Sequence, residues 1–151
     1  MPVSERSTRT FLLDTNVFVA AVKKPRRETA TLRFILALLE REDVRLVGHV
    51  FWVEEMLRYA EEFRSETAAW LVGALLSRTR LVDVAPNFVT VCAKYVTTPD
   101  TADILHAAAC LQEQAILVSN DKHFDRIRDE GIIEVWSITK AIRSGFGVPT
   151  R

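Results

Sequence analysis

Acidic residues stand beside the apolar segments of this sequence at several separate points. Asp14 and Asp121 each come just after a short apolar run, while Glu55 and Asp103 lie within segments of helical period. Carboxylates gathered at one edge of a sheet would repel one another, and some would take up protons. Mg²⁺ or Mn²⁺ resolves that conflict, because hard divalent cations prefer oxygen ligands. Such ions hold phosphates and activate water, so the pattern predicts phosphoryl transfer or phosphodiester hydrolysis.

Helix capping is the competing explanation for some of these acids. Asp14 and Asp121 stand where a helix N-cap commonly follows a strand. Asp100 could cap the next helix, with Asp103 completing a capping-box-like pair. Capping explains Asp100 well and Asp103 only in part, because Asp103 lies at the edge of the apolar stripe. From that edge its carboxylate could point toward the end of the sheet.

Two adjacent glutamates, Glu54 and Glu55, are the candidates for the acid that the segment 51–63 contributes to the cluster. An apolar helical face is predicted from the spacing of Trp52, Met56 and Tyr59, and Glu55 falls within that face. Glu54 falls on the polar side, where a solvated carboxylate is ordinary. An inward carboxylate is costly unless it is paired or binds a cation. The pattern therefore favours Glu55 as the functional residue, with a buried structural ion pair as the alternative.

The elements that must position these acids are short strands alternating with helices. Apolar runs predict strands at 11–13, 45–48, 81–84, 116–119 and 132–136. Helical periodicity predicts helices at 51–63, 67–77, 87–96 and 100–113, and the spacing of Leu32, Ile35, Leu36 and Leu39 indicates another. This alternation predicts a three-layer α/β/α sandwich around a central, mostly parallel five-stranded sheet. Ligands of such folds bind beyond the carboxyl ends of the strands.

Composition narrows the class of protein. The 151 residues include 20 Lys+Arg and 20 Asp+Glu, which gives a formal net charge of zero and argues against binding nucleic acid by bulk positive charge. The two cysteines, Cys92 and Cys110, form no zinc-binding motif, and we expect buried, reduced thiols. The start of the chain carries no apolar signal-peptide core, and no apolar run approaches the ~20 residues that span a bilayer. We expect a cytoplasmic protein with no membrane contact.

Four blocks of sequence resemble the PIN-domain family, which includes the VapC-type toxins of prokaryotic toxin–antitoxin pairs. The blocks are FLLDTNV at 11–17, EML at 55–57, TADILHAA at 101–108 and LVSNDKHF at 117–124. The interval from Asp103 to Asp121 matches the family's spacing. The resemblance implies a nuclease domain over residues 10–140, with a polar extension at 1–9 and a tail at 141–151. It also implies a Mg²⁺- or Mn²⁺-dependent ribonuclease on a parallel α/β/α sandwich.

The resemblance also assigns roles to single residues. The family's acidic quartet carries over to Asp14, Glu55, Asp103 and Asp121 as catalytic and metal-binding residues. Ser119 and Asn16 match positions that could orient water at the site, and Asp100 matches an extra acid of some relatives. The stretch 49–52, HVFW, departs from the family, since many relatives carry Ser or Thr before the glutamate. That departure leaves the choice of Glu55 resting partly on the helical argument.

Basic side chains cluster between residues 23 and 27, and a histidine lies within the segment 100–113. A solvated loop is one interpretation of Lys23, Lys24, Arg26 and Arg27, and the functional alternative is a rim that contacts the RNA backbone. His106 is expected on the more polar side of its helix near Glu113, as a surface histidine or one behind the metal ligands. The implied mechanism needs no histidine.

Three functions remain open on the sequence. The leading one is a metal-dependent endoribonuclease that cleaves RNA, with an antitoxin protein as its partner if it is a toxin. A second is a PIN-like RNA- or protein-binding module with weak or no cleavage, against which the intact quartet argues. A third is a phosphatase or receiver domain with Asp14 as covalent nucleophile. Asn16 disfavours the phosphatase, because phosphatases of the haloacid-dehalogenase type carry a second Asp there. Relatives are commonly dimers, and the sequence leaves a homodimer open.

Overall fold

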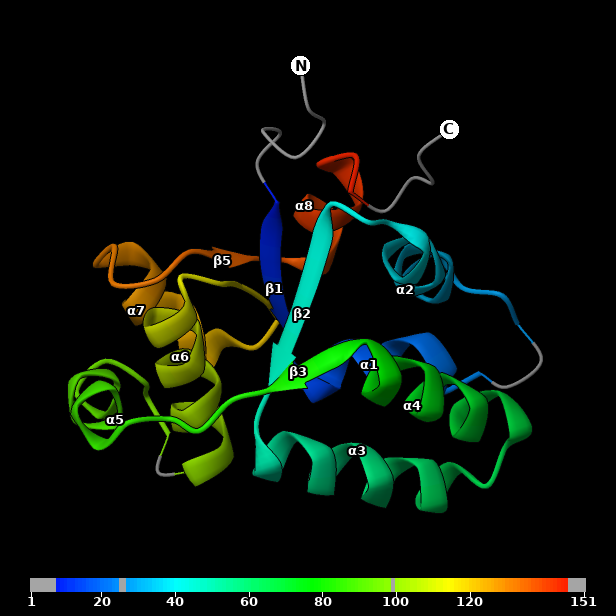
Figure 1. Ribbon diagram of the computed structural model, residues 1–151, viewed down its shortest axis with the longest axis horizontal. Coiled ribbons are helices and arrows are strands. Elements are labelled where there is room, and N and C mark those ends of the chain that lie inside the picture. Colours follow the sequence, from blue (N-terminus) through cyan, green and yellow to red (C-terminus); the bar gives the residue numbers. More distant parts are fainter. Residues whose placement is uncertain (1–7, 25–26, 99, 147–151) are drawn as a thin grey trace.

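A five-stranded parallel sheet forms the centre of the molecule (Figure 1). The computed structural model describes residues 8–24, 27–98 and 100–146. The strands span Arg9–Leu13 (β1), Val44–Gly48 (β2), Thr79–Leu81 (β3), Ile116–Val118 (β4) and Val135–Trp136 (β5), in the order β3-β2-β1-β4-β5. Every strand pairing in this described part is parallel. The strand order places β1 and β4 side by side, so the acids that follow them meet at one edge.

Helices cover both faces of the sheet and complete the expected three-layer sandwich. They span Thr15–Val22 (α1), Ala30–Glu40 (α2), Val50–Phe63 (α3), Glu66–Arg78 (α4), Pro86–Ala93 (α5), Thr101–Glu113 (α6), Asp125–Asp129 (α7) and Ile138–Arg143 (α8). Figure 1 shows α1 to α4 on one side of the sheet and α5 to α7 on the other. Contacts within each group, such as α1 with α2 and α5 with α6, agree with this division.

The two edge strands of the sheet, β3 and β5, are shorter than the sequence predicts. The third covers 79–81 instead of 81–84, because its partner β2 ends at Gly48, where the chain turns into α3. The fifth covers only 135–136 instead of 132–136, because only Leu117 and Val118 of β4 lie opposite it. In both cases the available partner strand, and not local apolarity, sets the length.

One close approach fixes α3 against the end of the sheet. The Trp52 ring packs on Gly48, and an added Cβ at Gly48 would lie only 2.7 Å from Trp52 Cε3. The Trp52 indole Nε1–H donates to the Leu13 carbonyl over 2.7 Å. Trp52 therefore joins the start of α3 to the last residue of β1, immediately before Asp14.

Both cysteines of the chain lie in the interior of the fold. Cys92 and Cys110 are both buried and free, as the sequence predicts. Burial raises the pKa of the Cys92 thiol to about 11, so this thiol stays protonated at neutral pH. Among the described residues, none of the helices combines the length and apolarity needed to cross a membrane.

Candidate functional site

Asp14 lies at the carboxyl end of β1 and is almost completely buried, with 2% of its surface exposed. Its position precedes α1, but its side chain makes no capping hydrogen bond to that helix. Instead, the Ser119 hydroxyl donates to Asp14 Oδ2 over 2.6 Å, and the Asp121 backbone N–H donates to Ser119 Oγ over 3.0 Å. Ser119 is therefore aimed at a carboxylate oxygen, and it links the ends of β1 and β4.

Asp103 and Asp121 face each other across His123. The His123 Nδ1 atom lies 3.3 Å from Asp103 Oδ2 and 3.1 Å from Asp121 Oδ1. Asp121 also caps the short 3₁₀ turn η2, Lys122–Phe124, by accepting from the His123 backbone N–H. Asp103 does not complete a capping box with Asp100, because the Asp100 backbone N–H donates to Thr98 Oγ1. The carboxylate of Asp103 instead turns toward the edge of the sheet.

Glu55 lies on the inward side of α3, as the helical spacing predicts, and Glu54 is exposed. The side chain of Glu55 is 20% exposed, and its Oε1 atom is buried with no hydrogen-bond partner in the described part of the chain. A buried carboxylate oxygen without a donor is costly, so this atom is suited to a cation or a nearby N–H.

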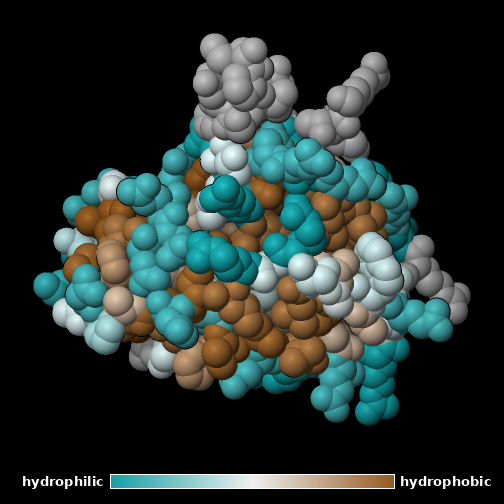
Figure 2. Space-filling model, in the orientation of Figure 1, coloured by the Kyte–Doolittle hydropathy of each residue, from teal (hydrophilic) through white to brown (hydrophobic). Residues whose placement is uncertain are grey.

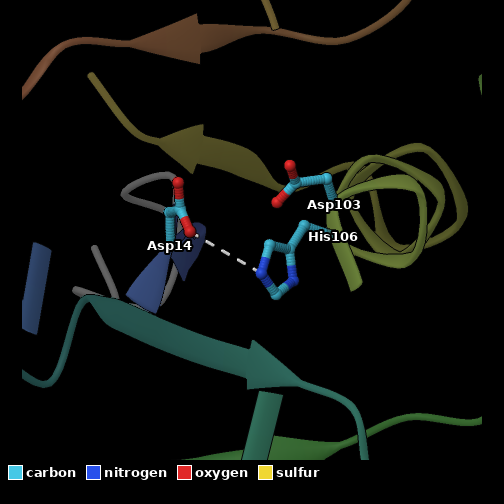
Figure 3. Close-up of side chains that lie close together, drawn as sticks. All are labelled: Asp14, Asp103 and His106. Carbon is cyan, nitrogen blue, oxygen red and sulfur yellow. Dashed lines mark ion pairs between the residues drawn. The ribbon is translucent and has the colours of Figure 1, made fainter. Parts of the chain in front are cut away.

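Three of the acids form two neighbouring groups that share Asp103, and Figure 3 shows the group of Asp14, Asp103 and His106. Ligand atoms of Asp14, Asp103 and His106 lie within 4.8 Å of one another, and so do those of Asp103, Asp121 and His123. Burial and the Asp14 charge raise the pKa of Asp103 to about 6, while His106 and a hydrogen bond from His123 act in the opposite direction. These residues fit Mg²⁺ or Mn²⁺, because the quartet offers carboxylate oxygens and a cation would relieve their repulsion.

Two further histidines, His106 and His49, lie beside the acidic residues, and only His106 was considered for such a position on the sequence. The expectation that His106 lies at the surface near Glu113 is wrong: its side chain is fully buried, and its Nε2 atom lies 3.6 Å from Asp14 Oδ1 and 3.5 Å from Glu55 Oε1. His49 is also buried, and its Nε2 lies 2.7 Å from His106 Nδ1. One signal pointed to His106: it is three residues after Asp103 on α6, so both share a helix face.

The remaining predicted residues lie around this cluster. Asp100 is exposed and caps α6, accepting from the Ala102 backbone N–H over 2.9 Å. Together with Glu54 and Glu55 it lines a cleft of about 300 Å³ between α3 and the start of α6. Arg58, which the sequence analysis did not single out, lies on the same cleft, 3.9 Å from Glu55. Asn16 is exposed in the first turn of α1.

The basic loop is not part of the acidic cluster. Lys23, Lys24 and Arg27 are exposed beyond the end of α1, while Arg26 lies outside the described residues. Asp14 precedes this helix of 8 residues, and its length separates Asp14 from the loop by roughly 12 Å.

Comparison with known proteins identifies the family. A family model for the PIN domain matches residues 11–130. The chain belongs to the PIN-domain family. The matched part of this PIN domain contains the whole acidic quartet, from the end of β1 to Asp121. A search of curated protein sequences finds no match.

Solved structures agree with this fold. The PIN domain resembles a chain of VapBC2 from Rickettsia felis, solved bound to a DNA fragment from its promoter, with a TM-score of 0.62 and 18% identity over 85% of this chain and 98% of that one. It also resembles a chain of VapBC-1 from nontypeable Haemophilus influenzae, with a TM-score of 0.59 and 19% identity over 87% of this chain and 99% of that one.

Proposed function

We propose that this PIN domain is a metal-dependent endoribonuclease and the toxin of a toxin–antitoxin pair. The observation that carries the proposal is that Asp103 lies close to both Asp14 and Asp121, which come from separate elements of the fold. Glu55 of a further element reaches the same histidine, His106, as Asp14 does. Such a cluster is unfavourable without a cation, as the raised pKa of Asp103 indicates. The likeness to chains of VapBC complexes supports the toxin role.

In the proposed mechanism the quartet would hold Mg²⁺ or Mn²⁺, which supplies charge for the phosphate and an activated water. The chain's own residues set the geometry. Ser119 holds Asp14 by one oxygen, and His123 lies between Asp103 and Asp121. These contacts restrict the rotamers of three carboxylates, so little rearrangement is needed when the cation binds.

The cleft between α3 and α6 is the proposed entrance for RNA. Its walls include Phe51, which is 44% exposed, and Arg58, which is mostly exposed. An exposed ring can stack on an unpaired base, and a guanidinium can pair with a phosphate. Lys23, Lys24 and Arg27 would contact the RNA backbone farther from the scissile bond.

Cleavage of single-stranded RNA tests this function. We expect cleavage with Mn²⁺ or Mg²⁺, and loss of cleavage with EDTA or in Asp14→Asn. Glu55→Gln should also lose activity, whereas the matched variant Glu54→Gln should keep most of it, because Glu54 is exposed. Activity that survives both EDTA and Asp14→Asn would refute the metal mechanism. Metal binding without cleavage would favour an RNA- or protein-binding module.

A protein partner is proposed for the hydrophobic surface around α3. Figure 2 shows hydrophobic residues gathered over β3 and α3. The exposed apolar side chains of these elements include Val50, Phe51, Leu57 and Leu81. An antitoxin that covers this surface would also reach the cleft, since Phe51 lines both. Light scattering after coexpression with the neighbouring reading frame measures the mass of the resulting complex. We expect a complex of this chain with the coexpressed protein in a 1:1 or higher ratio. A homodimer of this chain alone would contradict this assignment.

A further inference from the structure

A series of contacts runs from the start of α3 through His49 and His106 to the acidic cluster. His49 caps α3: its Nδ1 atom accepts from the Trp52 backbone N–H over 3.3 Å. Its other ring nitrogen, Nε2, lies 2.7 Å from His106 Nδ1. The remaining nitrogen of His106, Nε2, faces Asp14 Oδ1 and Glu55 Oε1. Both rings are buried, so water does not compete for these contacts.

The capping contact determines where the protons sit. A backbone N–H always donates, so His49 Nδ1 must carry a lone pair. Burial and the neighbouring His106 lower the pKa of His49 to about 3, so at neutral pH its single ring proton is on Nε2. That proton points at His106 Nδ1, which therefore accepts. A neutral His106 then carries its own proton on Nε2, facing the carboxylates.

We infer that His106 is a neutral Nε2–H donor that positions the Asp14 and Glu55 carboxylates, and that His49 imposes this tautomer on it. The inference rests on the proposed function in one respect, since the positioned carboxylates are the proposed cation ligands. It excludes a direct ligand role for His106, because a ligating Nε2 needs its lone pair. The His106 proton would then be on Nδ1, where it would oppose the Nε2–H of His49 over 2.7 Å.

Two unpartnered atoms support this assignment. Among the described residues, His106 Nε2 and Glu55 Oε1 are both buried without a hydrogen-bond partner, and they face each other over 3.5 Å. A donor opposite an acceptor is a favourable arrangement, and a small movement of either side chain closes the contact. Two lone pairs in the same positions would repel each other. The same N–H also faces Asp14 Oδ1, while Ser119 holds the other oxygen of Asp14.

Nuclear magnetic resonance of the ¹⁵N-labelled wild-type protein tests the tautomer directly. Long-range ¹H–¹⁵N correlations distinguish a protonated from an unprotonated ring nitrogen. We expect His106 to carry its proton on Nε2 both without metal and with saturating Mg²⁺. A proton on Nδ1, or loss of the Nε2 proton when Mg²⁺ binds, would overturn the inference.

Calorimetric titration with Mn²⁺ tests the positioning role through variants. His49→Ser keeps a side-chain cap for α3 but removes the ring, and His106→Leu removes the donor. We expect either change to weaken Mn²⁺ binding by roughly tenfold or more. His106→Gln should stay close to wild type, because its amide N–H reaches the same carboxylates.

The matched control is Cys110→Ala, one turn farther along α6 and also buried. It should lower the melting temperature in EDTA and leave the Mn²⁺ affinity unchanged. Wild-type affinity in His49→Ser, or equal weakening in His106→Gln and His106→Leu, would overturn the positioning role. Absence of Mn²⁺ binding by wild type would refute the proposed function as well, whereas an Nδ1–H tautomer in a wild type that binds Mn²⁺ refutes this inference alone.

Discussion

At the scale of single residues, Asp103 shows that burial and the neighbouring charge of Asp14 disfavour an ionised carboxylate in the cluster. Its raised pKa, about 6, means that the folded protein tolerates the ionised form less well than the unfolded chain does. At neutral pH without metal, Asp103→Asn should therefore increase the free energy of unfolding by ~1–2 kcal/mol, a value reduced for partial exposure to solvent. Urea denaturation in EDTA measures this change.

The control for Asp103→Asn is Asp125→Asn, an exposed acid outside the cluster, which should change stability by less than about 0.5 kcal/mol. Saturating Mn²⁺ should reverse the order of wild type and Asp103→Asn, because only the wild type gains the cation. A destabilised Asp103→Asn in EDTA would show that the carboxylate is well compensated by its neighbours.

His49 makes the free energy of unfolding depend on pH in the direction opposite to Asp103. Its pKa is lowered from 6.5 to about 3, so the folded state binds this proton less tightly than the unfolded chain. Its contribution to stability is complete above pH 6.5 and is lost as the pH falls toward 3. Between pH 6 and pH 4 the advantage of wild type over His49→Ser should shrink by about 1 kcal/mol per pH unit.

The comparison with His49→Ser is needed because Asp103 acts in the other direction over nearly the same interval. Its pKa is raised, so its protonation adds stability as the pH falls from about 6 to 4. Subtracting the two denaturation curves in EDTA removes that contribution, which both proteins share. A difference that is constant with pH would show that His49 titrates normally.

At the scale of elements, the junction of β2 with α3 places Glu55. Gly48 leaves room for the Trp52 ring, whose indole donates to Leu13. Gly48→Ala should lower the free energy of unfolding by ~1–3 kcal/mol, because the new methyl group would overlap a buried ring. Gly73→Ala on α4 is the matched control: nothing lies within 4 Å of its added Cβ, and we expect a stabilisation of up to ~1 kcal/mol. Thermal unfolding of both variants measures the effect, and equal stability of the two would contradict the overlap.

At the scale of the whole molecule, a cation at the cluster would join segments that are far apart in the sequence. The unfolded chain cannot reproduce this arrangement, so a metal should bind only the folded state. Mn²⁺ at 100 times its Kd should add about 2.7 kcal/mol to the free energy of unfolding. The melting temperature should rise by roughly 5–10 °C for a chain of this size. The same rise in Asp14→Asn would exclude a shared site and point to a metal bound elsewhere.

The neutral net charge of the chain conceals a separation of charge. Acidic side chains gather at the carboxyl edge of β1 and β4, while Lys23, Lys24 and Arg27 lie beyond the far end of α1. On the sequence, these basic residues were either a solvated loop or a rim of the site. In the folded protein a helix length separates them from it, because α1 runs away from Asp14.

Local patterns in the sequence determined the sandwich and the positions of the acids. An apolar run followed by a carboxylate predicts the carboxyl end of a strand in a parallel fold. Asp14 and Asp121 illustrate this, since they follow β1 and β4. Helical spacing was enough to place Glu55 inward and Glu54 outward, because the period of a helix is independent of what packs against it. The family resemblance rested on these same residues.

Only the tertiary structure decided the limits of the edge strands and the role of the histidines. A strand ends where its partner ends, and that partner is distant in the sequence, as Gly48 is for β3. His49 and His106 are separated by 57 positions, and each looks ordinary in its own segment. Their contact exists because β2, α3 and α6 meet beside Asp14. Packing between distant elements, which no local spacing encodes, turns two separate rings into one hydrogen-bonded path to the acidic cluster.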